Sequence, residues 1–394
     1  MSARRVGGLV VPLLAVVSAG CGSSAGASSR GLPDGGGQAG ASGGQAGARG
    51  AGGATPDGSI GGSDVDGAST RDGSIGGSGG ASGPLVWRPL APTGLGSSVI
   101  ESIWGSGPGG DLYLGTVDAK IFHRARDGSW TQKTVGSDVV GALWGSSAQD
   151  VYAASRNDLD AGGTLYHSTG NDVWTPVSLP TAATSLSAIW GSSPTDVYVG
   201  GDGPASIFHL TNGTWSNEGT AVAKNAIQAI WGSSATDVYA LGRDGNELWR
   251  SMGDGTWAVD SDNDTHLGAA IWGSDAANVY IGVSPYNNNM GPAEIVYSTG
   301  DGHWTKQFSM SPYQLTSLWG SGPADVYAGG FHMDSDNLAD AVAVFHATGD
   351  GQWSSLTVPA LEAVTCIWGS GPGDVYLGGY DADGNGTLVR GAPN

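Results

Sequence analysis

Apolar and polar residues alternate along a short segment that occurs seven times. The first copy reads Ile103-Trp104-Gly105-Ser106 and continues through a turn to Asp111 and Tyr113. The other six read Ile or Leu, Trp-Gly-Ser, a short turn and Asp-Val-Tyr, with Asn278 for Asp in the fifth, and have their tryptophans at Trp144, Trp190, Trp231, Trp272, Trp319 and Trp368. Alternation places the Trp on one face of a strand and the aliphatic residue on the other. We expect both faces to be buried, and the Gly and Ser to turn the chain into a second strand.

The spacing of these copies predicts the architecture. Their tryptophans lie 40 to 49 residues apart, which is the length of one four-stranded propeller blade. A turn containing Gly and a further Trp follow the first six copies, at Trp130, Trp174, Trp215, Trp257, Trp304 and Trp353. The seventh copy lacks this Trp, and Trp87 lies ahead of the first copy. The sequence therefore predicts an all-β fold, a seven-bladed β-propeller over residues 85–394, in which Val86 to Leu90 completes the last blade and leaves no open sheet edge.

The N-terminal region has the layout of an export signal. Residues 1–20 contain Arg4 and Arg5, an apolar run and small residues before Cys21. This arrangement resembles the lipobox of bacterial lipoproteins, in which that cysteine is lipidated, although Ser18 stands where the lipobox has Leu and a plain secretory signal is the alternative. Residues 21–84 are mainly Gly, Ala and Ser without an aromatic residue, which predicts a disordered tether. We expect an exported lipoprotein of the outer membrane or cell surface, on its periplasmic or extracellular side, that contacts the membrane through the lipid only.

The chain is strongly acidic. It has 16 Lys and Arg against 36 Asp and Glu, a formal net charge of −20. Such a surface repels nucleic acid, so we expect no nucleic-acid partner. Of the 2 cysteines, Cys366 lies two residues before Trp368, where the other copies have Ser or Ala, and is expected to be a small packing residue. We expect a monomer.

The repeats resemble a known propeller family. The pairing of Trp-Gly-Ser-x-x-x-Asp-Val-Tyr with a later Asp/Asn-Gly-x-Trp turn is similar to propellers of secreted bacterial proteins that carry sialidase-type or photosystem-assembly-type repeats. The resemblance extends from Trp87 to the C-terminus. It implies the propeller fold and leaves two classes of function open, an enzyme and a binding module.

Residues that recur in every blade are expected to be structural. A position repeated around a ring reaches seven separate points and cannot converge on one substrate away from the axis. One third-strand position illustrates this: it holds His123, His167, His209 and His346, with Arg250, Ser298 and Arg390 in the other blades. Four imidazoles on separate blades lie too far apart to share a metal ion.

The sequence favours a protein without catalytic activity. A sialidase-like reaction, as the resemblance implies, needs three arginines, a nucleophilic Tyr with a Glu partner, and an acid. No arginine lies on an inner strand. Glu101 is the one acid at the third position before a blade Trp; with Gln228 at the equivalent position, it is expected at the mouth of the channel without a second carboxylate. We expect a binding or scaffold module, and the alternative is a sialidase-like glycoside hydrolase or lyase at the channel mouth.

Length variation points to a binding face. The loops between the second and third strands vary most, and the longest, Ser284 to Glu294 and Phe331 to Ala341, belong to neighbouring blades five and six. Function is commonly carried by such loops. We expect them to form one polar sector that binds a protein or carbohydrate, made of Asp262, Asp264, His266, Tyr286, Asn287, Asn288, Tyr313, His332, Asp334, Asp336, Tyr380, Asp381 and Asp383.

Three acidic loops have part of a calcium-binding pattern. The loop that begins Asp381-Ala382-Asp383-Gly384-Asn385 matches the opening of a calcium loop, but Val389 and Ala392 occupy the positions of the closing ligands. Asp260, Asp262 and Asp264 alternate in the same way, as do Asp334 and Asp336. Solvation of hairpins is the simpler explanation, so we expect no cofactor and leave Ca²⁺ as the alternative.

Overall fold

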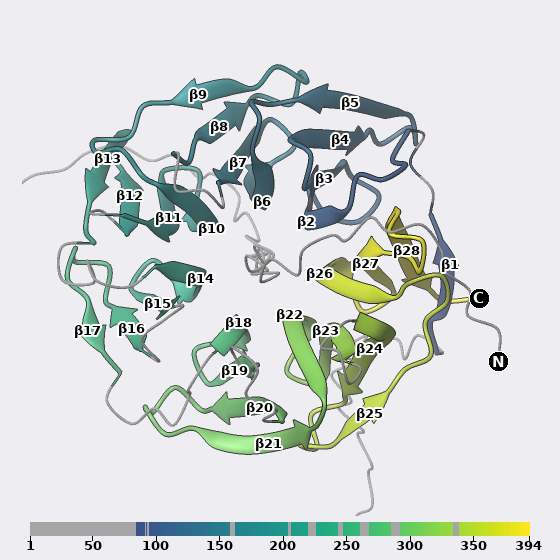
Figure 1. The fold of residues 1–394 in the computed structure, drawn as a ribbon. Coiled ribbons are helices and arrows are strands. Elements are labelled where there is room, and N and C mark those ends of the chain that lie inside the picture. The colour runs from purple at the N-terminus through teal and green to yellow at the C-terminus, as the bar shows by residue number, and fades with distance from the viewer. Residues whose placement is uncertain are drawn as a thin grey trace, which may run out of the picture. The chain divides into compact units, whose positions relative to one another are not determined.

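The chain folds as a ring of β-sheets. The computed structural model describes residues 84–90, 92, 94–157, 162–203, 206–219, 226–242, 247–260, 268–284, 292–333 and 339–394. Within these ranges all regular elements are strands, which form seven four-stranded antiparallel sheets around an axis (Figure 1). The predicted seven-bladed β-propeller is confirmed. None of the described residues forms a helix that could span a bilayer.

Each blade begins at the axis with two long strands. The inner strands are β2 (Ile100–Gly105), β6 (Val139–Ser147), β10 (Ser185–Ser193), β14 (Ile227–Ser234), β18 (Gly268–Asp275), β22 (Tyr313–Gly322) and β26 (Ala363–Gly371). The second strands are β3 (Leu112–Thr116), β7 (Asp150–Arg156), β11 (Asp196–Asp202), β15 (Asp237–Gly242), β19 (Asn278–Val283), β23 (Asp325–Met333) and β27 (Asp374–Tyr380). Both positions are mostly buried because each blade is covered by a neighbour on either side.

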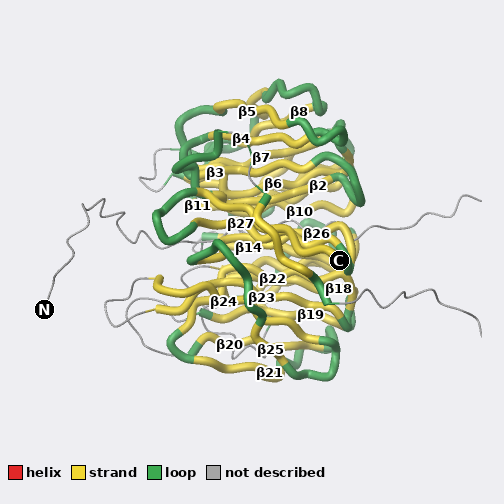
Figure 2. The backbone as a smooth tube through the Cα atoms, turned by 90° about the vertical axis from the view of Figure 1, so that its right-hand side faces the viewer, coloured by secondary structure: helices red, strands yellow, loops and turns green. Residues whose placement is uncertain are grey.

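Two further strands complete each blade toward the outside. The third strands are β4 (Lys120–Arg124), β8 (Leu165–Ser168), β12 (Ile207–Thr211), β16 (Leu248–Ser251), β20 (Ala293–Ser298), β24 (Ala339–Ala347) and β28 (Gly386–Ala392). The outer strands are β5 (Trp130–Thr134), β9 (Thr175–Val177), β13 (Thr214–Asn217), β17 (Ala258–Val259), β21 (Thr305–Met310), β25 (Trp353–Ser355) and β1 (Val86–Pro89). Figure 2 shows the strands running between the two faces of the ring.

The ring is closed by its N-terminal strand, as predicted. In Figure 1 the blue β1 lies beside the yellow β28, and the register pairs Val86 with Ala392 and Pro89 with Val389. The order β1-β28-β27-β26 makes β1 the outer strand of blade seven. The Arg88 guanidinium also donates a hydrogen bond to the Asn394 side chain over 3.1 Å. The two ends of the fold are therefore held in one sheet.

Each blade is packed on the next by a tryptophan and a glycine. The seven repeat tryptophans are 1% to 4% exposed. Each indole lies over the repeat glycine of the following blade, so closely that a Cβ on that glycine would be under 3.0 Å from the ring. The series runs from Trp104 over Gly145 to Trp319 over Gly369, and Trp368 over Gly105 completes the circle. The same contact therefore forms all seven seams.

The glycine has a different role from the one expected. We expected Gly and Ser to turn the chain, but the inner strand continues through the glycine, which pairs in register with the Val of Asp-Val-Tyr, or with Leu112 in blade one. In blade four this pair is Gly232 with Val238. The absence of a side chain at this position is needed for the neighbouring indole rather than for a turn.

The outer tryptophans make a second contact between blades. Trp174, Trp215, Trp257 and Trp353 each stand edge-on against the Asp-Val-Tyr tyrosine of the preceding blade, with ring centroids 5.9 to 6.2 Å apart. Trp87 does the same with Tyr327, at 6.3 Å and 79°. Such edge-to-face pairs are favourable beyond the area they bury. The strand that closes the ring thus supplies the outer Trp that blade seven lacks.

Two glycines of β22 allow the tryptophan–glycine contact to be tested. A Cβ at Gly320 would lie 2.5 Å from Cη2 of Trp272 and 2.6 Å from the Asp325 carbonyl oxygen, whereas one at Gly322 would have no heavy atom within 4 Å. We expect Gly320→Ala to lower the free energy of unfolding by about 1–3 kcal/mol through overpacking. Gly322→Ala should leave it unchanged or raise it by up to about 1 kcal/mol. Denaturant unfolding of both variants measures the difference, and equal stabilities would contradict the assigned role.

Candidate functional site

The two faces of the ring are built differently. Turns between first and second strands and between third and fourth strands lie on one face. The connections after the second strands and those leading into the inner strands lie on the other, which we call the loop face. Because the strands alternate in direction, this division follows from the antiparallel order. The described residues of the sector predicted to bind a partner belong to the loop face: Tyr313, His332, Tyr380, Asp381 and Asp383.

Every inner strand has a β-bulge near its loop-face end. The register slips at the third residue before the repeat Trp in all seven blades. The bulge residues are Glu101, Gly141, Ser187, Gln228, Ala269, Thr316 and Thr365. Glu101 and Gln228, which we expected at the mouth of the channel, are only 3% and 4% exposed. They are enclosed between blades, where their polar atoms need partners.

Polar side chains at these bulges bond across the seams. The hydroxyls of Thr316 and Thr365 donate to the carbonyls of Val364 and Ile100 in the next blades, over 2.7 and 2.5 Å. The bulge residues Ser187 and Gln228 bond in the same way to Ile227 and Ala269. Ser102 and Ser284, which lie outside the bulges, also bond across seams, to Val140 and Leu315. The role of the bulge residues in most blades is thus to join neighbouring inner strands.

An ion pair joins blades one and two at the position of these bulges. The Arg156 guanidinium, at the end of β7 in blade two, lies 3.3 Å from a carboxylate oxygen of Glu101 in blade one, and their side chains are 6% and 3% exposed. Gly141, the bulge residue of blade two, lies beside this arginine: a Cβ there would be 3.8 Å from the Arg156 Cβ and Nη1, which is an ordinary van der Waals contact. The sequence analysis missed this pair, because it looked for arginines on inner strands only. The signal available in the sequence was an acid on the inner strand of one blade and an arginine at the end of the second strand of the next blade.

Tyr380 adds a phenol to this region. It lies at the end of β27, and its carbonyl accepts a hydrogen bond of 2.9 Å from the Glu362 backbone N–H. Burial raises the pKa of Tyr380, and the negative charges of Glu362 and Glu101 raise it further. The phenol is therefore protonated at neutral pH and can donate a hydrogen bond or a proton. Glu362 was also absent from the sequence analysis.

Blade six extends farther toward the loop face than the other blades. Its strands β22, β23 and β24 have ten, nine and nine residues. Tyr313 pairs in register with His332, and their rings meet edge-on at 5.0 Å. The His332 Nδ1 lies 2.5 Å from an Asp340 carboxylate oxygen on β24. The structure therefore brings together Tyr313 and His332 of the predicted sector and adds Asp340.

The neighbouring hairpin end of blade seven carries Tyr380, Asp381 and Asp383. Tyr380 packs with Ala339 against a cluster of Phe331, Met333 and Ala363, which joins it to the extended end of blade six. The Asp381 carboxylate accepts hydrogen bonds from the backbone N–H groups of Asp383 and Asn385, over 3.0 and 2.8 Å. It therefore stabilises the turn directly.

Other predicted site residues lie outside the described ranges. These are Cys21, Asp262, Asp264, His266, Tyr286, Asn287, Asn288, Asp334 and Asp336. Within the described ranges there is no group of three or more His, Cys, Asp or Glu side chains that could hold a metal ion.

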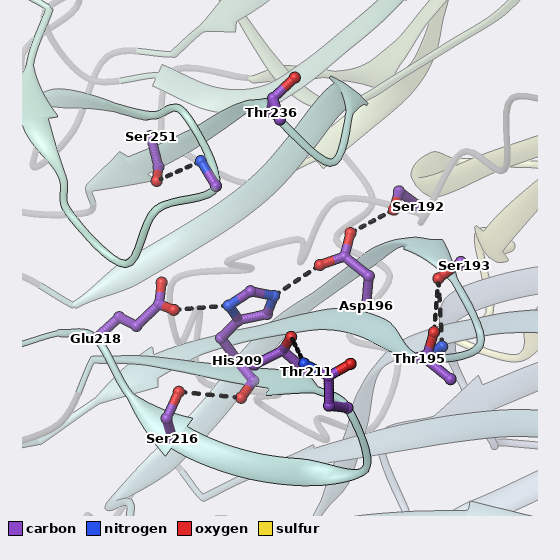
Figure 3. A network of polar contacts seen from close by, with 12 residues as sticks. Ser192, Ser193, Thr195, Asp196, His209, Thr211, Ser216, Glu218, Thr236 and Ser251 are labelled. Atoms are coloured by element: carbon purple, nitrogen blue, oxygen red, sulfur yellow. Dashed lines mark hydrogen bonds and ion pairs between the residues drawn. The ribbon is translucent and has the colours of Figure 1, made fainter. Parts of the chain in front are cut away.

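A Ser, an Asp and a His meet in several blades. Figure 3 shows the set of blade three, where Asp196 accepts a hydrogen bond from Ser192 and lies 2.7 Å from the His209 Nε2. In a nucleophilic triad the serine bonds to the imidazole. Here it bonds to the carboxylate, so the histidine activates no nucleophile, and Tyr198 covers the imidazole at 3.8 Å. The set is structural, as the repetition predicts.

In the other blades, the residue at the position of His209 is a histidine, an arginine or a tyrosine. Histidine lies 2.8 to 2.9 Å from the repeat Asp in blades one, two and six, while Arg250 and Arg390 take its place in blades four and seven. In blade five the residue paired with Tyr280 is Tyr297, whose hydroxyl bonds to Asn278 over 3.0 Å. The expectation of Ser298 at this position was wrong by one residue.

His209 is held from both sides. Its Nδ1 lies 2.6 Å from a Glu218 oxygen, and the other Glu218 oxygen accepts a hydrogen bond of 3.2 Å from the Trp257 indole of the next blade. Burial alone would lower the pKa of His209. The hydrogen bonds and negative charges of Asp196 and Glu218 outweigh that effect and raise its pKa to about 9. The Glu218 carboxylate therefore bridges His209 of blade three and Trp257 of blade four.

Comparison with known proteins identifies the fold. No protein-family model and no curated protein matches the sequence. Among solved structures, virginiamycin B lyase from Staphylococcus aureus is similar with a TM-score of 0.63 and 13% identity over 78% of this chain and 99% of that chain. YCF48 bound to D1 peptide gives 0.58 and 14%, over 78% and 97%. YCF48 from Cyanidioschyzon merolae gives 0.55 and 14%, over 78% and 99%. At these identities the likeness establishes a shared propeller fold.

The raised pKa of His209 predicts a pH dependence. Since the folded pKa exceeds the ordinary 6.5, the stabilisation is fully present below pH 6.5 and is lost as the pH rises through about 9. At 1.36 kcal/mol per pKa unit the loss is on the order of 3 kcal/mol. We expect His209→Gln to destabilise the protein more at pH 6 than at pH 9.5 in denaturant unfolding, with Glu218→Gln giving an intermediate dependence. A difference between parent and variant that is constant with pH would contradict the assignment.

Proposed function

We propose that this protein is an exported, lipid-anchored and non-catalytic β-propeller that binds a partner on its loop face. The observation that carries the proposal is the extension of blade six, where Tyr313, His332 and Asp340 are presented beside Tyr380 of blade seven. This is a departure from the repeat, and function is commonly carried by variable loops and strand ends on a constant scaffold. Aromatic rings with polar atoms suit either a protein or a carbohydrate partner.

A solved structure of similar fold supports a protein partner over a carbohydrate. YCF48, a propeller of similar fold, is known with a bound D1 peptide. The net charge of −20 further favours a partner with basic segments, since opposite charges speed encounter and suppress wrong partners. In this proposal the propeller binds the partner, and only the lipid on Cys21 contacts the membrane.

The region around Tyr380 favours a second candidate, a lyase or glycoside hydrolase. It combines a phenol, two carboxylates and a guanidinium, and virginiamycin B lyase shares the fold. Two features weigh against it. The raised pKa of Tyr380 is opposite to what a phenolate nucleophile requires, and Glu101 is engaged by Arg156 at 3.3 Å. Tyr380 could still donate a proton, so Tyr380→Phe is the variant that would abolish such an activity while keeping the packing.

A pair of substitutions on the loop face tests the binding proposal. The tagged full-length protein is crosslinked on intact producing cells, and captured partners are quantified by mass spectrometry. We expect Tyr313→Ala with His332→Ala to reduce the principal partner at least about tenfold, as loss of an aromatic anchor does. The control is Asp254→Ala with Thr256→Ala, which alters an exposed turn on the opposite face. Full capture by the loop-face variant, with an unchanged melting temperature, would rule out this sector.

The anchor is tested separately. The motif before Cys21 predicts that lipid on this residue holds the protein at the membrane, and a dually or triply acylated cysteine binds bilayers stably. We expect Cys21→Ser to move the protein from the membrane fraction to the soluble one, as measured by fractionation and by mass. A variant that stays in the membrane fraction with the mass of the parent would show that the anchor lies elsewhere.

A further inference from the structure

The third strand of blade six has an uncovered outer edge. β24 runs over nine residues, Ala339–Ala347, but β25 pairs only with Phe345 to Ala347. One further bond, from the Leu356 N–H to the Val344 carbonyl over 2.8 Å, ends the contact. Among the residues that the structure describes, none pairs with the outer side of Ala339 to Ala343. In blade five, by contrast, β21 pairs with β20 along its length, from Ala293 to Tyr297.

The path of the chain explains this edge. After Leu356 the chain turns toward blade seven, where Val358 and Leu361 are buried at 6% and 7% exposure in the cluster around Trp319. Pro359 between them cannot donate to a strand. Strand β24 meanwhile extends toward the loop face, so Ala339 to Ala343 lie beyond the end of the described strand β25.

The backbone of this edge is ready to accept a strand. The Val344 carbonyl points outward, because it accepts the bond from Leu356. In an antiparallel ladder the direction repeats every second residue, so the N–H and C=O of Val342 also point outward. The alternating neighbours Ala339, Ala341 and Ala343 are small and leave the approach clear. An unpaired edge of this kind is a template for another strand.

We propose that the outer edge of β24, residues Ala339 to Ala343, binds an extended basic peptide segment of another protein, which adds to blade six as a fifth strand. The inference deepens the proposed function, on which it rests, by naming the partner class. Main-chain hydrogen bonds supply affinity in this mode, and side-chain pockets along the strand supply specificity. An incoming residue opposite Ala341 extends the cross-strand row that Tyr313, His332 and Ala341 already form.

Charge selects the occupant. The Asp340 side chain is 45% exposed at a bulge in this edge, beside His332. A second copy would bring another net charge of −20 and a second Asp340 against the first. Like charges that face each other across two edge strands discourage such self-pairing. A segment with Lys or Arg would instead be attracted to this edge, because the small Ala341 lets a long basic side chain reach the Asp340 carboxylate.

The experiment uses a defined probe on the full-length protein. A fluorescein-labelled decapeptide of alternating lysine and valine is titrated by fluorescence anisotropy, alongside the same peptide with glutamate for lysine and one with alternate N-methylated amides. We expect the basic peptide to bind, and the acidic and N-methylated peptides to bind at least about tenfold more weakly. Hydrogen exchange should show protection of the Val342 amide by the basic peptide.

Two variants at Val342 distinguish the contribution of the main-chain N–H to binding from that of the side chain. Val342→Pro removes the outward N–H without removing a bond to β23, a place where an edge strand tolerates proline. We expect it to weaken binding of the basic peptide about tenfold or more, while Val342→Ala changes it by less than about threefold. Asp340→Asn should weaken the basic peptide and spare an uncharged one of alternating threonine and valine.

Several outcomes would overturn the inference. These are no binding of the basic peptide, equal binding of the N-methylated peptide, or equal effects of Val342→Pro and Val342→Ala. If the parent protein forms dimers and the Val342→Pro variant is monomeric, the occupant of the edge is a second copy of this chain. Should the proline variant fail to fold, the N-methylated peptide on the parent protein gives the same answer. The proposed function is separately decided by partner capture with the Tyr313 and His332 variants, so its failure is distinguishable.

Discussion

The structure depends on an indole that fills the space above a glycine in the next blade. Seven such contacts form the ring, and each needs two residues from different blades. Because interiors are packed like crystals, neither partner can change size without moving the seam. The hydrogen bonds at the bulges and the edge-on outer tryptophans stabilise the same seams, at the spacing that this contact sets. Variation in length is accordingly found at the ends of the strands, where no indole sets the spacing.

The sequence was sufficient for the architecture because the repeat marks both ends of each blade. The period predicted seven blades, and the missing outer Trp of the last blade predicted the strand around Trp87. Local patterns were weaker where contacts cross between blades. Alternation tells which face a residue occupies but not which neighbour it meets, so the role of the repeat glycine was wrong and Arg156 was overlooked. The assignment of Ser298 failed for a related reason, since register depends on pairing rather than on spacing alone.

The candidate site could be predicted only in outline. Loop length singled out the hairpin of blade six, and Tyr313 and His332 meet there. The pairing of His332 with Asp340, and the enclosure of Glu101 by a guanidinium from the adjacent blade, arise from the bulges that shift each strand by one residue. Bulges leave no clear mark in a sequence. Most polar residues of the repeat serve the fold, and chemistry is therefore to be sought at the few positions where a blade departs from its neighbours.

Closure of the ring by β1 has a mechanical consequence. Any pull that travels along the chain from its N-terminal side enters the propeller at Val86, and the first bonds to carry it are those between β1 and β28. The strand is short, with four paired residues, and is backed by Trp87 against Tyr327 and by the bond from the Leu90 N–H to Leu388. Under tension blade seven therefore yields before the other six, and the weakest point of the ring under load is the strand pairing that closes it.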